Sequence, residues 1–154
     1  ATRRAKLATY HNRKLRERGW DGDAAPDVER LVERLAASGL IDDALYAQSK
    51  ARSLTERGYG MARVRQSLRA AGINETDGAQ AQKLAADGAA DAALRFARRR
   101  RLGPYAEKLL ERPDREKALA AMVRAGHGFE LARAVVNAEP GSELDLDELR
   151  EKGR

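Results

Sequence analysis

A short phrase that recurs at a nearly constant interval constrains this fold more than any other feature of the sequence. Leu15-Arg-Glu-Arg-Gly19-Trp20 returns as Leu68-Arg-Ala-Ala-Gly72-Ile73 and, in altered form, as Met122-Val-Arg-Ala-Gly126-His127. The intervals are 53 and 54 residues, and the phrase Gly39–Leu45 is echoed by Gly88–Leu94. A regular interval of this length is typical of tandem structural units. The sequence therefore predicts three copies of one small module.

Every substantial segment carries the apolar spacing of a helix. Two clear stripes follow the i, i+3, i+4, i+7 rule of an amphipathic helix: Val28, Leu31, Val32 and Leu35, and then Met61, Val64, Leu68 and Ala71. The second stripe ends at Gly72, where a left-handed backbone would suit glycine. No segment alternates convincingly with a period of two residues. We therefore expect an all-α fold of three tandem three-helix, helix-turn-helix-like repeats.

The repeats divide the chain into four parts. We expect repeat 1 over 1–39, repeat 2 over 40–88, repeat 3 over 89–138 and an acidic tail over 139–154. Repeat 1 lacks most of its opening helix, and the chain starts at Ala1 without a methionine, so we expect a processed chain or a fragment. The tail holds six acidic and three basic residues, and we expect it to fray apart from one turn around 144–149.

The composition favours a basic helical protein with an anionic partner. Charged residues make up 35% of the chain and aromatic residues only 5%, which suits helices with thin cores of Ala, Leu and Val. The net charge of +6 points to an anionic partner. The absence of cysteine excludes disulfides, a thiol nucleophile and thiolate metal sites. No apolar stretch approaches the roughly 18 residues of a membrane span, so we expect no membrane partner.

The charges fall in blocks along the sequence. Residues 1–20 carry seven basic and one acidic side chain, whereas residues 21–49 carry two basic and seven acidic ones. Residues 50–71 return to six basic and one acidic, and residues 95–101 contribute five arginines with no acid. This alternation predicts separate positive patches.

The candidate binding residues come from the two later basic blocks. They are Lys50, Arg52, Arg57, Tyr59, Arg63, Arg65, Arg69, Arg98, Arg99, Arg100 and Arg101. Residues 98–101 sweep about 300° around a helix, so they cannot share one face, and compensation of a helix dipole explains them equally well. Arg63, Arg65 and Arg69 could also form an ordinary solvated helix face.

Nothing in the sequence indicates catalysis. His11 and His127 lie at no metal-ligand spacing. His127 follows Gly126 as Trp20 follows Gly19, and we expect His127 to pack at a helix-turn junction and Trp20 to lie in the core. The pair Asp42-Asp43 is typical of a helix N-cap. The segment 58–60 lacks the Lys-Ser/Thr of a phosphate loop. We expect no enzyme, no cofactor and no metal site.

Several of these stretches resemble one known family. Residues 39–47, with Gly39-Leu-Ile-Asp-Asp-Ala-Leu, and residues 57–73 resemble the central signature of the RecX family of RecA regulators. Residues 13–20 resemble the end of that family's first repeat, and residues 117–136 resemble its third. Three departures stand at residues 7–11, where the family has Ser-Arg-x-Glu-Leu, at Met61, where a Pro is common, and at His127, where an aromatic residue is usual.

The resemblance implies an elongated, curved molecule and a cytoplasmic, non-enzymatic regulator, which we expect to be a monomer. Proteins similar to this one lie in the groove of the RecA–single-stranded DNA filament. They inhibit its ATPase, strand-exchange and coprotease activities, the last of which triggers the SOS response, and many bind single- and double-stranded DNA.

The rival reading is a stand-alone helical DNA-binding protein that acts through basic patches. A helix-turn-helix transcription factor is a weaker alternative, because no second helix pairs Asn or Gln with Arg for reading base edges.

Overall fold

The computed structural model describes residues 3–154 and confirms the expected all-α fold for them. Within this range there are nine α-helices, one short 3-10 turn and no strand. The elements are α1 (Arg4–Arg18), α2 (Val28–Ala37), α3 (Asp43–Glu56), α4 (Met61–Ala70), α5 (Glu75–Asp87), α6 (Ala89–Arg100), η1 (Gly103–Tyr105), α7 (Arg112–Arg124), α8 (Phe129–Val136) and α9 (Leu146–Lys152). We use repeat 1 for α1 and α2, repeat 2 for α3–α5 and repeat 3 for α6–α8; their residue limits remain predictions.

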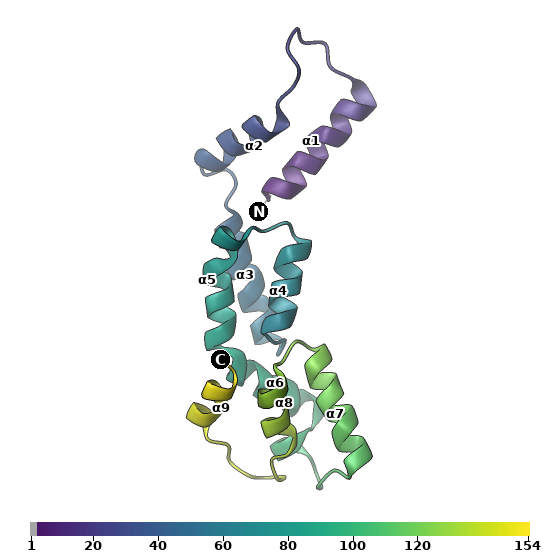
Figure 1. The fold of residues 1–154 in the computed structure, drawn as a ribbon, viewed down its shortest axis with the longest axis vertical. Coiled ribbons are helices and arrows are strands. Elements are labelled where there is room, and N and C mark those ends of the chain that lie inside the picture. The colour runs from purple at the N-terminus through teal and green to yellow at the C-terminus, as the bar shows by residue number, and fades with distance from the viewer. Residues whose placement is uncertain (1–2) are drawn as a thin grey trace.

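The helices stack along one axis, so the molecule is elongated. Figure 1 shows α1 and α2 at one end, α3–α5 in the middle and α6–α9 at the other end. The accessible surface is 10351 Å², whereas a compact monomer of this mass would expose about 7,700 Å². The extra surface is what three small units joined end to end should expose.

The recurrent glycine ends the same helix of each repeat. Gly19, Gly72 and Gly126 follow α1, α4 and α7 with φ of 73°, 73° and 99°. After α4, the Gly72 amide donates to the Arg69 carbonyl at 2.9 Å and the Ile73 amide to the Leu68 carbonyl at 3.0 Å. This pair of bonds is the Schellman helix ending, which requires the left-handed conformation that glycine adopts most easily. The sequence phrase is therefore a helix stop.

Repeats 2 and 3 have solid cores, and repeat 1 does not. In repeat 2 the core consists of Ala47, Ala51, Leu54, Val64, Leu68, Ala71, Ile73, Ala81 and Ala85. The core of repeat 3 centres on Met122, Leu131 and Val135, which are at most 1% exposed. Helix α1 has no buried residue, and α2 buries only Val32.

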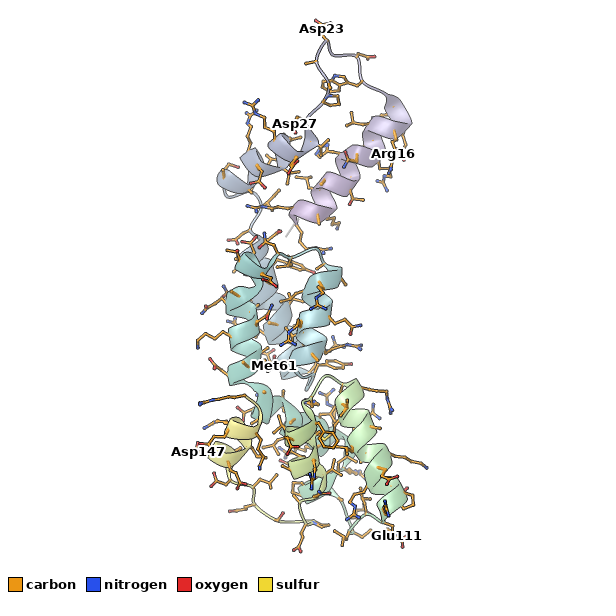
Figure 2. The ribbon with its side chains drawn as sticks, in the orientation of Figure 1. Arg16, Asp23, Asp27, Met61, Glu111 and Asp147 are labelled. Carbon is orange, nitrogen blue, oxygen red and sulfur yellow. The ribbon has the colours of Figure 1, made fainter. Side chains whose placement is uncertain are left out.

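Trp20 is not in a core, so that expectation was wrong. It is 56% exposed, and its indole Nε1 donates to the Ala24 carbonyl at 2.6 Å. The residue begins the loop between α1 and α2, which lies at the outer end of the molecule, where Figure 2 labels Asp23. With two helices in repeat 1, no neighbour covers this loop.

The acidic tail carries helix α9, which extends beyond the one turn expected around residues 144–149. The Asp145 carboxylate caps this helix by accepting from the amides of Asp147 at 2.9 Å and Glu148 at 3.3 Å. Leu149 is 2% exposed and joins the core of repeat 3, where α9 contacts α6 and α8. A short capped helix with Leu149 buried in the core of repeat 3 thus anchors the tail.

Candidate functional site

Repeats 2 and 3 meet where the N-terminus of α4 abuts the C-terminus of α7. The Gly60 amide donates to the Ala125 carbonyl at 2.9 Å, and the Ala62 amide donates to the Gly126 carbonyl at 3.1 Å. A Cβ atom on Gly60 would lie only 2.3 Å from the Gly126 oxygen. The two backbones therefore touch without intervening side chains, and this joint orients the side chains around it.

His127 closes the same joint and is a structural residue. It is 4% exposed, its Nε2 lies 2.9 Å from the Gly58 carbonyl oxygen, and its ring centroid lies 5.5 Å from that of Phe96. Burial lowers the pKa of His127, and the hydrogen bond to Gly58 opposes this only in part. The neutral ring donates from Nε2, and the expectation that His127 packs at a helix-turn junction is confirmed.

A pocket rich in arginine opens beside the joint, with a volume of about 230 Å³. Three elements supply its four guanidinium groups: Arg57 ends α3, Arg99 and Arg100 end α6, and Arg124 ends α7. The remaining lining residues are Tyr59, Phe96, Ala121 and Ala125. We call this the arginine pocket.

The positive charge of the arginine pocket is not neutralised by carboxylates. No Asp or Glu lines it, and within residues 3–154 none of its four arginines lies within 4.0 Å of a carboxylate. Aromatic rings accompany the cations instead. The Cζ atoms of Arg57 and Arg63 lie 5.2 Å from the Tyr59 ring centroid, and that of Arg100 lies 5.4 Å from the Phe96 centroid.

The structure divides the four consecutive arginines 98–101. Arg99 and Arg100 line the arginine pocket, and Arg98 does not. Arg101 adopts the left-handed conformation, with φ of 54°, and its Nη1 pairs with the Glu107 carboxylate at 3.5 Å. The four side chains therefore do not share one site, in agreement with the sweep expected for a helix.

A second basic pocket lies at the joint between repeats 1 and 2. It has a volume of about 460 Å³, and its polar and aromatic lining is Arg3, Lys6, Thr9, Tyr10, Arg13 and Arg69. A Cβ on Gly72, at the end of α4, would lie 2.6 Å from the Ala5 Cβ, and the Arg3 Nη1 donates to the Ala71 carbonyl at 2.5 Å. This pocket, which we call the upper basic pocket, contains no carboxylate either.

The sequence-derived set is thus split over the surface. Of the eleven candidate residues, Arg57, Tyr59, Arg99 and Arg100 line the arginine pocket, Arg63 lies over Tyr59, and Arg69 lines the upper basic pocket. Lys50, Arg52 and Arg65 line neither pocket. Arg3, Lys6 and Arg13 were not among the candidates, although they belong to the basic block 1–20, because the candidates came only from the two later blocks. Arg124 was not among them because it lies outside every basic block. Arg124 stands in the third copy of the recurrent phrase, which was the available signal for this residue.

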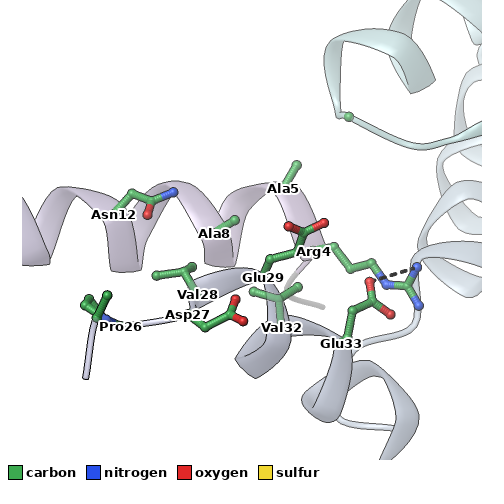
Figure 3. A pocket seen from close by; sticks show the side chains of 12 residues that line it. Arg4, Ala5, Ala8, Asn12, Pro26, Asp27, Val28, Glu29, Val32 and Glu33 are labelled. Atoms are coloured by element: carbon green, nitrogen blue, oxygen red, sulfur yellow. Dashed lines mark ion pairs between the residues drawn. The ribbon is translucent and has the colours of Figure 1, made fainter. Parts of the chain in front are cut away.

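A third feature is the open groove of repeat 1, shown in Figure 3. It has a volume of about 830 Å³ and lies between α1 and α2, with Ala5, Ala8, Val28 and Val32 among its apolar lining. The Arg4 guanidinium pairs with the Glu33 carboxylate at 3.8 Å at its edge. In repeat 2 the helices α4 and α5 both pack against α3, whereas repeat 1 consists of α1 and α2 alone. The groove therefore stays open because repeat 1 has one helix fewer than repeat 2.

Residues 3–154 offer no group of three or more His, Cys, Asp or Glu side chains that could hold a metal ion. In the same part of the chain, no helix combines the length and the apolar character needed to cross a membrane.

Comparison with known proteins gives consistent matches to one family. Residues 42–81 match the description "RecX, second three-helix domain". Regulatory protein RecX of Myxococcus xanthus (strain DK1622) is 38% identical over 128 residues, which cover 79% of this chain and 67% of that protein. Regulatory protein RecX of Pseudomonas entomophila (strain L48) is 42% identical over 67 residues, or 42% of this chain and 40% of that protein. Regulatory protein RecX of Pseudomonas putida (strain W619) is 41% identical over 69 residues, which cover 45% of this chain and 42% of that protein. No solved structure matches this chain.

Proposed function

This chain belongs to the RecX family, and from that premise we propose that it is a non-enzymatic regulator of the RecA recombinase. In this proposal it lies in the groove of the RecA–single-stranded DNA filament. There it inhibits the ATPase, strand-exchange and coprotease activities of the filament.

The observation that carries the proposal is that a basic pocket without a lining carboxylate lies at each of the two joints of an elongated molecule. The upper basic pocket lies at the joint of repeats 1 and 2, and the arginine pocket lies at the joint of repeats 2 and 3. A helical filament repeats its surface at regular intervals, so a chain with a basic pocket at each of two successive joints can engage successive subunits. Each linked contact raises the effective concentration of the next.

RecA-dependent ATP hydrolysis on single-stranded DNA tests this function. We expect the wild-type protein to lower the rate, and the double reversal Arg65→Glu/Arg69→Glu to weaken that inhibition. Both arginines are exposed on α4 and lie outside the repeat 2 core, so the helical circular dichroism spectrum should not change. The matched control is Lys83→Glu/Arg112→Glu, which makes the same change in charge at exposed residues paired with Asp87 and Glu116.

The rival function, a stand-alone DNA-binding protein, is tested in the same samples. Its affinity for bare DNA should fall steeply with salt, because each neutralised phosphate releases counterions. If the wild type binds bare DNA in this way and leaves RecA hydrolysis unchanged at saturating protein, the rival function replaces the proposed one. Loss of DNA binding with full inhibition of RecA in the Arg65/Arg69 variant would show that the two activities use different surfaces.

A further inference from the structure

We infer that the arginine pocket is a phosphate-binding site shared by repeats 2 and 3. Its ligand is a phosphate group held by the guanidinium groups of Arg57, Arg99, Arg100 and Arg124. This inference deepens the proposed function, since the pocket lies on the surface assigned to the filament, but the ligand is argued from the pocket alone.

The first support is that the pocket is built by the fold. Arg57 and Arg99 approach each other because Gly58 has a left-handed backbone, with φ of 85°, packed against α6. A Cβ at this position would lie 3.0 Å from both the Arg99 Nη2 and the Phe96 backbone nitrogen. The hydrogen-bonded joint of α4 with α7 then brings Arg124 beside them. Four like charges are held close together by backbone geometry, with no carboxylate to relieve their repulsion.

The second support is the match between pocket and ligand chemistry. A volume of about 230 Å³ lies below the roughly 300–1,000 Å³ of sites for drug-sized ligands, so the pocket suits a small anionic group. Each guanidinium group offers a rigid fork of N–H donors that fits phosphate oxygens bidentately. A single carboxylate brings one charge and two oxygens. A phosphate brings more oxygens and up to two charges, so it can satisfy several forks at once.

Calorimetric titration of the purified full chain tests the ligand without RecA, so its result is independent of the proposed function. The probes are sodium pyrophosphate, a short oligothymidine and an oligoglutamate peptide, at constant pH and at an ionic strength held constant with chloride. We expect pyrophosphate to bind, and Arg99→Gln/Arg124→Gln to weaken its binding at least tenfold. The control Arg112→Gln/Arg133→Gln removes the same charge from exposed positions in repeat 3 outside the pocket, and should change binding less than twofold.

A second variant tests whether pyrophosphate binding depends on the shape of the guanidinium groups and not only on their charge. Arg99→Lys/Arg124→Lys keeps both charges but loses the forks, and should weaken pyrophosphate binding several-fold with an unchanged circular dichroism spectrum. Displacement of pyrophosphate by oligothymidine would identify nucleic acid as the phosphate source, and binding of pyrophosphate without displacement would identify a free phosphate compound; both support the inference. It is overturned if no phosphate compound binds, if the control loses as much affinity as the pocket variants, or if only oligoglutamate binds.

Discussion

Replacing Gly60 by alanine should break the joint between repeats 2 and 3. Gly60 has φ of −86° and ψ of 176°, an ordinary extended conformation that alanine adopts without strain. The obstacle is space, because the new Cβ would lie 2.3 Å from the Gly126 oxygen and 2.5 Å from the His127 nitrogen. Both are backbone atoms and cannot rotate away, so α4 and α7 must separate.

The cost can be worked out from the contacts that separation breaks. Two backbone hydrogen bonds, from Gly60 to Ala125 and from Ala62 to Gly126, contribute about 1 kcal/mol each. Forcing a methyl group into a packed contact costs about 1–3 kcal/mol. The smaller conformational entropy of the unfolded alanine chain returns about 0.4–1 kcal/mol. The free energy of unfolding should therefore fall by about 3 kcal/mol, which lowers Tm by about 6–12 °C in a chain of this length.

Gly128→Ala is the matched control, because Gly128 also precedes a helix, has φ of −64° and has nothing within 4 Å of its would-be Cβ. Its Tm should change little, because the gain from the smaller entropy of the unfolded chain is offset by the weaker N-cap preference of alanine, which applies at Gly60 as well. Urea titration followed by circular dichroism measures both variants. If Gly60→Ala and Gly128→Ala differ by less than about 0.5 kcal/mol, a difference typical of neutral surface substitutions, the contact between α4 and α7 is not as described.

Three further predictions concern stability. Leu68 is 3% exposed in the repeat 2 core, and Leu68→Ala should lower the free energy of unfolding, measured by urea titration, by about 2–4 kcal/mol. Leu40→Ala, at a 72% exposed site, should leave it nearly unchanged. Because burial lowers the pKa of His127, the unfolded chain takes up the proton first; wild-type stability should fall as pH drops below about 6.5. His127→Gln should lack this component when urea midpoints at pH 7.5 and 5.5 are compared. Arg101→Gly should raise the free energy of unfolding by about 1 kcal/mol, because glycine adopts the left-handed backbone of this position without strain. Little is lost with the ion pair to Glu107, because both side chains are largely exposed. A lower thermal midpoint in the variant would contradict this.

Local chemistry explains why much of this fold could be predicted. The recurrent phrase places a helix end at Gly19, Gly72 and Gly126, because such an ending depends only on residues within about one turn. The Schellman pair of bonds forms at Gly72 and Gly126, whereas the Gly19 amide donates a single bond to the Leu15 carbonyl at 2.9 Å. The Asp42 carboxylate accepts from the Leu45 amide at 2.9 Å, as expected for an N-cap three residues away. The stripe ending at Leu68 is buried, because period and polarity together determine which face of a helix avoids water.

Tertiary structure decided everything that depends on which repeats touch. Trp20 and His127 occupy equivalent places after their glycines, yet one is exposed at the end of the rod and the other is buried in a joint. Leu149 is buried because α6 and α8 lie beside the tail, which its own acidic segment does not reveal.

The candidate site was likewise determined in part by the sequence and in part by the tertiary structure. The sequence alone determined that the basic residues fall in blocks and that arginines 98–101 cannot share one helix face. The arginine pocket exists only because Gly58 and Gly60 let three helix ends approach, which brings Arg57, Arg99 and Arg124 together across 67 residues of chain. Local patterns record bonds within a turn, whereas contacts between distant residues depend on packing that no single segment specifies.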